Sequence, residues 1–285
     1  MNEGVKRKWG ALGLIPFVLV FFNVSMAWAG AWTQKKGAGY HRLAGTYYVS
    51  DHDFDHRGDA RPSKDHGEFI EYAINYYGEY GLWDSVTVFG SLYYKDMERE
   101  DDYMTYSTSG VGDMDLGLRF QLYNGKLGVI SLQGLVKLSA FYDEDDPMPL
   151  GNGQNDYELR LMMGRSLWPV VPGYINLEAG YRLRDEDPAD EFRCLIEVGT
   201  DLGQKCYLRA KLDALVSIKN GDTATDNWGN PTHTLEYDLA KLDMTFGMKL
   251  TPALALELGC TPAMWGENTS KGTTYTIALS FCHGN

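Results

Sequence analysis

Histidine alternates with aspartate in one short stretch of the chain, formed by Asp51, His52, Asp53, Asp55 and His56. A histidine beside a carboxylate could serve as the general base of a protease, and mixed oxygen and nitrogen ligands could hold a divalent metal ion. The spacing matches no closed metal site, and the calcium-loop pattern with glycine at position six and glutamate at position twelve is absent. We therefore expect a solvated loop, with a protease and a loop-bound metal as the alternatives, and we predict no enzyme activity and no cofactor.

Charged residues recur with a different spacing in the rest of the chain. In residues 113–122, one face carries Asp113, Asp115, Gly117, Arg119 and Gln121, and the other carries Met114, Leu116, Leu118, Phe120 and Leu122. A period of two places successive side chains on opposite faces of a β-strand. Nearly all of the chain after residue 39 alternates in this way, which predicts strands that face two different environments.

Twelve such segments can be counted, at about 39–50, 67–78, 85–96, 110–123, 127–140, 155–168, 174–184, 191–202, 206–219, 233–250, 254–261 and 272–281. Their connections alternate between short ones and long ones, the long ones being 51–66, 97–109, 141–154, 185–190, 220–232 and 262–271. Outer-membrane barrels have short periplasmic turns, long extracellular loops and an even number of strands. We therefore predict an all-β fold, a closed antiparallel transmembrane β-barrel of about twelve strands. The alternative is a soluble β-sandwich or lipocalin-like barrel, which has no reason to sort its loops by length.

Lipid cannot satisfy polar groups, so in such a barrel the apolar face must point outward and the polar face inward. This assigns to the lumen the candidates Arg42, Glu71, Asn75, Asp113, Arg119, Lys137, Glu158, Arg160, Glu178, Arg182, Arg193, Glu197, Arg209, Lys211, Asp213, Asp243, Lys249 and Glu257. Symmetric hairpins would place Glu197 across from Lys211, and Asp113 across from Lys137. These charges could simply fill the barrel and fix its register, or they could select solutes in a narrow pore.

The beginning of the chain has the pattern of a secretory leader. Lys6, Arg7 and Lys8 precede an apolar run from Leu12 to Val24, and small residues stand at Ala27 and Ala29. This pattern predicts a signal peptide at residues 1–29 and a barrel domain at residues 30–285, with an uncleaved anchor as the alternative. Four cysteines would suggest disulfides in an exported protein, but hairpin register would set Cys194 opposite about residue 214. We expect all four cysteines to be unpaired.

Composition excludes other classes of protein. The net charge is −13 and the hydrophobic fraction is 44%, so the chain is neither a nucleic-acid-binding protein nor a disordered one. Its mean hydropathy of −0.33 and single long apolar run exclude a polytopic helical membrane protein. The last expected strand has alternate apolar residues that end at Phe281, which resembles the C-terminal signal read by the barrel-assembly machinery.

Two motifs in the middle of the chain resemble a known family. Tyr80-Gly81-Leu82-Trp83-Asp84-Ser85 is similar to the Y-G-L-T-D-x turn of outer-membrane proteins of the phenol meta-pathway family. Residues 112–119 resemble that family's G-D-x-x-L-G-L-K/R strand, and residues 135–138 parallel its V-K-L-P segment, with Ser139 in place of the proline. The resemblance implies an outer-membrane barrel that passes small, often aromatic or hydrophobic, molecules.

These observations favour a passive channel in the outer membrane of a Gram-negative bacterium. Its expected partners are the lipid bilayer, the barrel-assembly machinery and a small-molecule solute, and nucleic acid is not among them. Residues 51–66 and 141–154 are the expected constriction, if a long loop folds inward. The alternative function is a non-transport surface protein that displays acidic loops for adhesion or for exopolysaccharide export partners.

Overall fold

The computed structural model describes residues 30–284, apart from residues 140, 144–147, 186–187, 222–223, 226–230 and 234–235. The predicted signal peptide at residues 1–29 lies outside the described residues. In the described part of the chain, no helix is long and apolar enough to cross a membrane.

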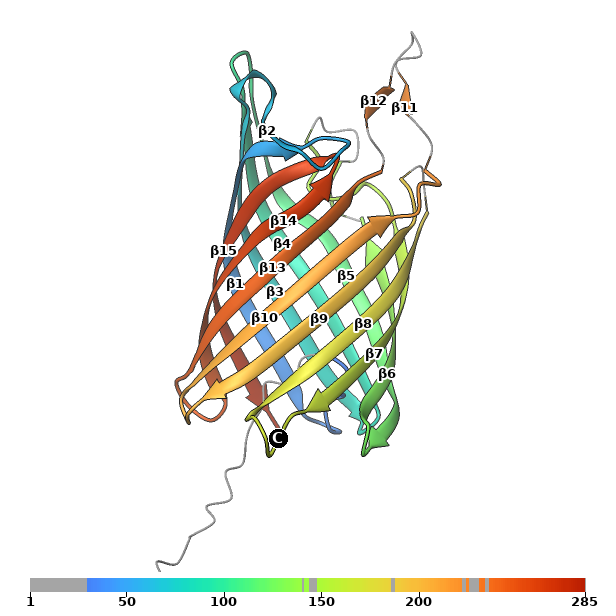
Figure 1. The fold of residues 1–285 in the computed structure, drawn as a ribbon, viewed down its shortest axis with the longest axis vertical. Coiled ribbons are helices and arrows are strands. Elements are labelled where there is room, and N and C mark those ends of the chain that lie inside the picture. The colour runs from blue at the N-terminus through green and yellow to red at the C-terminus, as the bar shows by residue number, and fades with distance from the viewer. Residues whose placement is uncertain are drawn as a thin grey trace, which may run out of the picture.

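A single antiparallel sheet closes on itself into a barrel (Figure 1). In the described residues the ring has twelve strands, as predicted from the alternation. They are β1 Gly39–Phe54, β3 Glu68–Trp83, β4 Val86–Glu100, β5 Thr105–Gly125, β6 Gly128–Leu138, β7 Asp156–Ser166, β8 Gly173–Arg184, β9 Glu191–Leu202, β10 Cys206–Ser217, β13 Asp238–Lys249, β14 Leu254–Glu267 and β15 Thr269–His283. The ring closes where β1 pairs with β15, in a ladder that begins at Gly39 and His283. Closure leaves no sheet edge within the wall, which a bilayer requires.

Short elements lie above the ring at its extracellular end. They are β2 Ala60–Pro62, the 3-10 helix η1 Lys64–His66, β11 Ala224–Thr225 and β12 Pro231–His233. β2 pairs with the upper end of β1, and Figure 1 shows it at the upper rim of the barrel.

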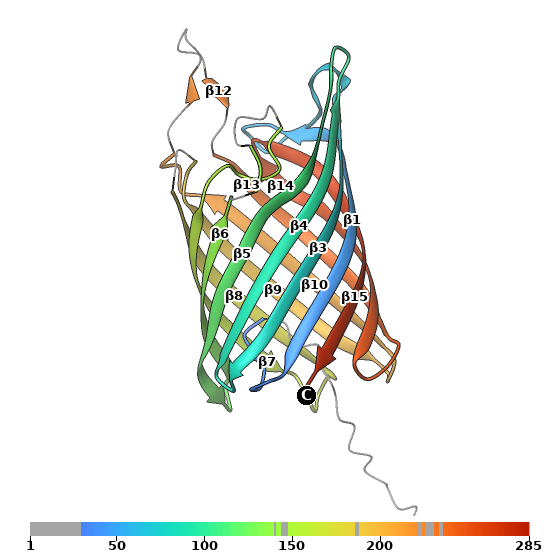
Figure 2. The same ribbon diagram turned by 180° about the vertical axis from the view of Figure 1, so that it is seen from behind.

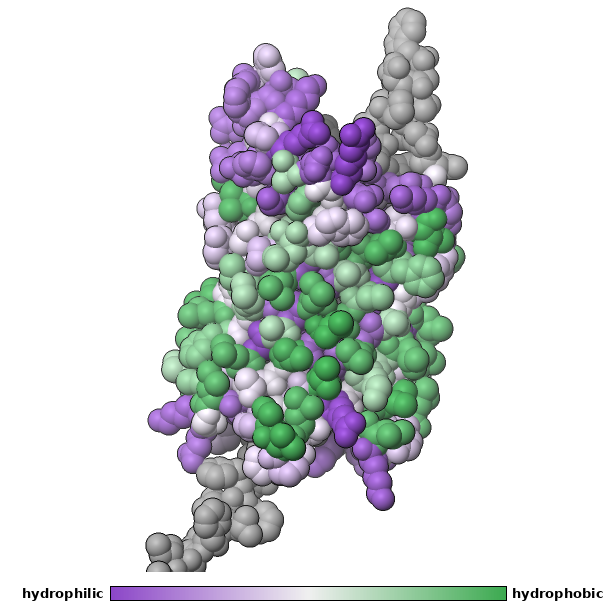
Figure 3. Space-filling model, in the orientation of Figure 1, coloured by the Kyte–Doolittle hydropathy of each residue, from purple (hydrophilic) through white to green (hydrophobic). Residues whose placement is uncertain are grey.

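The apolar face of each strand points outward, as predicted. Leu116, Leu118 and Phe120 are 46%, 40% and 42% exposed, whereas Arg119 between them is 3% exposed. On the face shown in Figure 3, apolar side chains cover the middle and lower part of the barrel, and hydrophilic side chains gather at the extracellular end. Such an apolar surface is the signature of a wall that faces hydrocarbon.

The prediction of a long loop at residues 262–271 is wrong. β14 and β15 continue through this range and are joined at Asn268, whose φ is +51°. The expected loop at 97–109 likewise shrinks, because β4 and β5 extend it as a hairpin that rises above the rim (Figure 2). The alternating pattern ends where the strands leave the bilayer, but paired backbone groups satisfy each other in water as well, so the ladders continue.

The predicted register around the cysteines is confirmed. Cys194 lies across from Ala214 in the β9–β10 ladder, and all four cysteines are free.

Candidate functional site: the charged bore and its chamber

Three buried glutamates mark the periplasmic half of the bore, and each accepts a hydrogen bond from a tyrosine. The first is Glu79 on β3, which accepts from the Tyr77 hydroxyl and from the Gln34 side-chain amide at 2.7 Å. Arg119 on β5 completes the group, with its Nη1 3.1 Å from Glu79 Oε1. A buried carboxylate needs such partners, because removing an ion from water is costly unless it is paired and hydrogen-bonded.

The second glutamate, Glu257 on β14, is fully buried and lies between two arginines. Its carboxylate is 2.8 Å from Arg42 Nε and 3.6 Å from Arg209 Nη2, and it accepts the Tyr207 hydroxyl at 2.8 Å. The third, Glu197 on β9, accepts the hydroxyl of Tyr174. The strands that carry these groups lie on different sides of the ring, so the groups line the bore from several directions.

A second network lies further toward the extracellular end, on β7, β8 and β9. Arg182 bridges three carboxylates, with Nη2 2.8 Å from Glu158 and Nη1 3.6 Å from Asp156 and 3.7 Å from Glu191. Arg160 Nη2 and Nη1 pair with Glu158 and Glu178. The charges of both signs therefore compensate each other along this wall.

The amino-terminal segment, residues 30–38, lies inside the periplasmic mouth. The Ala31 amide donates to Asn176 Oδ1 at 3.0 Å, and the Ser131 hydroxyl donates to the Ala31 carbonyl. The Gln34 amide donates to Thr87 Oγ1 at 2.8 Å, and the ring of Trp32 packs edge-on against Tyr174. The Gly37 amide donates to the Gly81 carbonyl of β3, and the Gly81 amide donates to the Ala38 carbonyl, both at 2.9 Å, while side chains of the wall bind the backbone of the earlier residues. The segment narrows the bore from below.

The expected constriction by residues 51–66 is not what the structure shows. That stretch forms the end of β1, β2 and η1 at the rim, and Ala60–Pro62 are exposed. In the other expected region, Tyr142 donates to Asp113 Oδ1 at 2.6 Å and Gly153 donates to the Tyr142 hydroxyl, so part of it approaches the wall of the bore. Residues 30–38 carry no periodic pattern that could have predicted this position, although a chain that enters β1 from the periplasm must pass this mouth.

Above the amino-terminal segment the bore opens into a chamber of about 390 Å³. Aromatic rings of Tyr40, Tyr77, Phe89 and Tyr93 line one part of it. Leu135, Met162 and Leu195 add apolar surface, and Gly30 of the amino-terminal segment reaches it too. A chamber of this size is large enough for a small molecule and its water.

Of the eighteen predicted lumen residues, Asn75 lines the chamber and Glu257 pairs with Arg42 and Arg209, and the other sixteen fall into two groups. Eleven line the chamber: Arg42, Arg119, Arg160, Glu178, Arg182, Arg193, Glu197, Arg209, Lys211, Asp213 and Asp243. The other five are ion-paired elsewhere along the bore: Glu71 with Lys95, Asp113 with Lys137, Glu158 with Arg160 and Arg182, and Lys249 with Asp201.

Of the two charge pairs predicted across neighbouring strands, one has the predicted register and the other does not. Glu197 does lie across from Lys211, but the Lys211 amine is 3.7 Å from Asp243 on the next strand. Lys137 lies across from Asp115 rather than Asp113, because the β5–β6 turn is centred between Lys126 and Leu127 and not at Gly125. Lys137 still reaches Asp113 diagonally, at 3.5 Å.

Several bore residues were missing from the predicted set. They are Glu79, Asp115, Asp156, Arg184, Glu191 and Lys241, together with the tyrosines that bind the glutamates. The period-two pattern already placed Asp115 on the polar face, and the same pattern in β3 could have found Glu79. The tyrosines carried no such signal, because tyrosine also belongs to the outer girdles.

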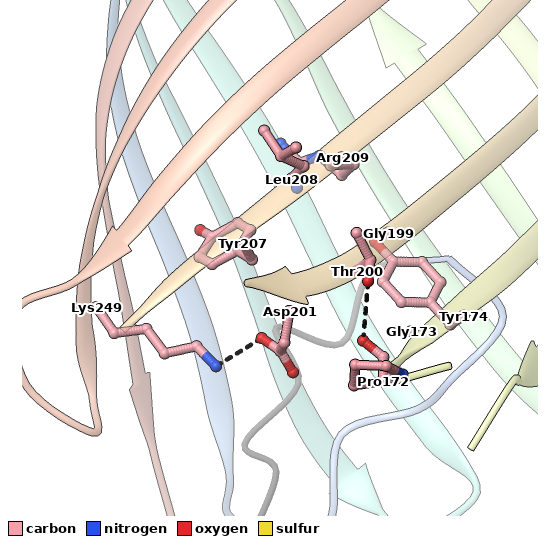
Figure 4. A pocket seen from close by; sticks show the side chains of 10 residues that line it. All are labelled: Pro172, Gly173, Tyr174, Gly199, Thr200, Asp201, Tyr207, Leu208, Arg209 and Lys249. Carbon is pink, nitrogen blue, oxygen red and sulfur yellow. Dashed lines mark hydrogen bonds and ion pairs between the residues drawn. The ribbon is translucent and has the colours of Figure 1, made fainter. Parts of the chain in front are cut away.

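A small cavity of about 30 Å³ lies at the periplasmic ends of β8, β9 and β10 (Figure 4). Lys249 Nζ is 2.8 Å from Asp201 Oδ1 there, and the Thr200 hydroxyl donates to the Pro172 carbonyl at 3.3 Å. Its volume holds about one water molecule, so it is too small to hold a solute.

The rim histidines do not form the arrangements considered from sequence. His52 Nδ1 is 2.7 Å from Asp51, and Asp55 accepts the backbone amides of Arg57 and Asp59. Asp55 also pairs with Arg61 at 2.8 Å. In the described residues, no three His, Cys, Asp or Glu side chains gather closely enough to hold a metal ion.

Comparison with known proteins agrees with the fold. No protein-family model and no curated protein matches the chain. An outer-membrane channel from Pseudomonas putida F1 superposes with a TM-score of 0.70 and 13% identity, covering 88% of this chain and 97% of that one. The NanC porin gives 0.54 and 9% over 85% and 98%, and the translocator domain of the autotransporter NalP from Neisseria meningitidis gives 0.50 and 10% over 87% and 89%. At such identities the likeness is one of fold, and the chain has the fold of outer-membrane β-barrels.

Proposed function

We propose that this protein is a passive channel for small molecules in the outer membrane of a Gram-negative bacterium. The observation that carries the proposal is the chamber of about 390 Å³ enclosed by the barrel and lined by charged, polar and aromatic side chains. A barrel of twelve strands lies between eight-stranded barrels, whose interiors are filled, and porins of sixteen or more strands, which hold an aqueous channel.

The lining of the chamber defines the solutes. Its many charged groups favour molecules that carry polar substituents, since a purely apolar solute would desolvate them without compensation. The rings of Tyr40, Tyr77, Phe89 and Tyr93 offer faces against which a small aromatic ring could stack. Phenol-like compounds satisfy both conditions, in keeping with the sequence resemblance to the phenol meta-pathway family.

In this proposal the ion-paired charges of the bore select which solutes pass through the channel. Fixed charges that line a narrow pore discriminate between solutes by sign and size. In this bore most charges are compensated by neighbours, so we expect weak preference between small cations and anions.

A liposome-swelling assay tests the proposal. Purified protein should make liposomes permeable to arabinose and to a water-soluble phenol, and it should give discrete conductance in a planar bilayer. A Trp32→Ala, Gln34→Ala variant, which loosens the amino-terminal segment, should raise both rates. Permeability no greater than that of empty liposomes, for both the wild type and this variant, would reject the channel.

One observation favours the alternative of surface display. The amino-terminal segment is held in the periplasmic mouth by the hydrogen bonds of Ala31 and Gln34, and it narrows the bore. A barrel that displays its acidic extracellular end needs no open passage. The same swelling assay separates the two functions, because display predicts no permeability.

We also propose that the barrel-assembly machinery recognises β15. This strand keeps outward apolar residues at Tyr275, Ile277, Leu279 and Phe281, close to the end of the chain. Phe281→Ala should slow assembly in cells, whereas Phe246→Ala, on the outward face of β13, should not. Equal assembly of the two variants would reject the proposal.

A further inference from the structure

Two charged side chains of the bore stand apart from the networks described above. Among the described residues, Asp115 and Lys241 are the bore charges with neither a hydrogen bond nor an ion pair. Asp115 lines the chamber, and its Oδ1 is buried without a partner. Lys241 lies on β13, two residues to the extracellular side of Asp243, which also lines the chamber, and its side chain is exposed.

Each of these residues faces an opposite charge that is engaged elsewhere. Lys137 is the register partner of Asp115, but its amine is 3.5 Å from Asp113. Asp213 is the register partner of Lys241, but its carboxylate is 3.4 Å from Arg193. The buried Asp115 oxygen therefore has no partner, which is costly for the fold unless something else binds it, and the exposed Lys241 amine is free to bind an anion.

The two residues lie on opposite walls of the barrel. Between β5 and β13 the ring has five strands on one side, β6 to β10, and five on the other, β14, β15, β1, β3 and β4. Apolar side chains of Leu135 and Leu195 line the chamber on the strands in between. The bore thus has a free anion on one wall, a free cation on the other, and an apolar surface along the way.

We propose that the chamber binds small zwitterions whose ammonium and carboxylate groups lie at opposite ends of a short apolar chain. The ammonium would bind Asp115, the carboxylate would bind Lys241, and the methylene groups would pass over Leu135 and Leu195. This inference rests on the proposed function, since it names the class of solute that the channel's chamber takes.

Calorimetry on the detergent-solubilised full barrel tests the proposal without requiring transport. The probes are aminobutanoate, aminohexanoate and aminooctanoate, each with its amine on the terminal carbon, together with hexanoate and hexylamine. One length of the zwitterion should bind best, and the analogues that carry one charge should bind about tenfold more weakly, as expected for the loss of one charge-assisted contact.

Asp115→Asn and Lys241→Gln should each weaken binding of the best zwitterion about tenfold, and each should leave binding of one single-charge analogue unchanged. Asp96→Asn and Lys205→Gln are the matched controls, because Asp96 is on the outward face of β4, next to the inward Lys95, and Lys205 lies in the turn between β9 and β10. The controls should bind like the wild type. Each variant is used only after its heat-dependent mobility on gels shows a folded barrel.

The outcomes separate this inference from the proposed function. Zwitterion binding that is absent, or that is unchanged in both variants, overturns the inference even if liposomes swell. An effect of Lys241→Gln alone, with hexanoate as strong as aminohexanoate, identifies a simple anion site and also overturns it. Binding with the predicted dependence on both residues, but without permeability, supports the site and rejects the channel.

Discussion

Arg119 joins the wall of the bore to the amino-terminal segment. Its Nη1 lies 3.1 Å from Glu79 Oε1 and donates to the carbonyl of Trp32 at 3.0 Å, while Nε and Nη2 share the Gln133 side-chain oxygen. One guanidinium therefore neutralises a buried carboxylate and holds the segment that narrows the mouth. Stability of the barrel and closure of its periplasmic end are coupled through this residue.

Replacement of this arginine should affect both properties. Arg119→Met leaves Glu79 buried without its cation, which costs about 3–5 kcal/mol. It also removes a donor to Trp32, so the amino-terminal segment should loosen and the conductance should rise. Urea titration of the barrel in lipid vesicles measures the first effect, and planar-bilayer recording measures the second.

A matched variant shows whether burial is the cause. Lys95 and Glu71 pair at 3.5 Å with more than a fifth of each side chain exposed, so Lys95→Gln should cost less than about 1 kcal/mol. If Arg119→Met costs no more than Lys95→Gln, the bridging role assigned to Arg119 is wrong.

The opposite orientations of Leu118 and Leu135 give a second prediction. Leu118 points outward and is 40% exposed, and Leu135 on the next strand lines the chamber. An arginine in the hydrocarbon costs about 2–4 kcal/mol near the midplane of the membrane. Leu118→Arg should therefore lower the free energy of unfolding in lipid by about this amount, and Leu135→Arg should lower it less, because its guanidinium can reach the polar bore. The reverse order would contradict the orientation of β5 and β6.

The register of β9 and β10 gives a third prediction. Cys194 lies directly across from Ala214, and directly opposed residues in antiparallel strands come close enough for a disulfide. Ala214→Cys should therefore form a disulfide with Cys194 under mild oxidation, seen as protection of both thiols from alkylation. Ala210→Cys, which lies across from Val198, should remain reactive. Protection of Ala210→Cys instead would mean that the strands are shifted.

The register of two strands could be predicted from the sequence where both strands have a period-two pattern and a tight turn joins them. The turn near Gly203 placed Glu197 across from Lys211 and Cys194 near residue 214, because a short hairpin leaves one register. The prediction of ion pairs failed where the partner of a side chain lies on a strand of the neighbouring hairpin. Lys211 turns to Asp243 because β13 brings that carboxylate to the other side of β10, and no local signal fixes how two hairpins meet.

Irregular segments were the second source of error. The β5–β6 turn lies between Gly125 and Gly128 and an irregularity follows between Gln121 and Tyr123, so Lys137 lies across from Asp115 and not Asp113; the alternating pattern shows neither the centre of the turn nor the irregularity. The amino-terminal segment has neither helical nor strand periodicity, and its position depends on Asn176, Ser131 and Thr87, which come from three distant strands. Such contacts can be read from coordinates alone.

The last prediction concerns pH at the extracellular rim. His66 Nδ1 is 2.8 Å from Asp102 Oδ2, and the Asp102 amide donates to the Asp65 carbonyl at 3.0 Å, so η1 is tied to the β4–β5 turn. The hydrogen bond with Asp102 and the charge of that carboxylate raise the pKa of His66 above its ordinary value of 6.5. A raised pKa in the folded state stabilises the contact at pH values below the ordinary pKa, and the stabilisation is lost as the pH rises through the folded-state pKa.

Asp102→Asn should therefore lower the pKa of His66 toward 6.5 and remove the pH dependence of this contact. The imidazole can be followed by NMR in histidine-labelled protein, with His66→Asn used to assign its signal. Protection of residues 55–67 from protease should decline between mildly acidic and alkaline pH in the wild type, and it should be low throughout in Asp102→Asn. Asp101→Asn is the control, because Asp101 accepts the amides of Tyr103 and Met104 and does not contact the imidazole. An unchanged His66 pKa in Asp102→Asn would show that the pair does not hold the rim.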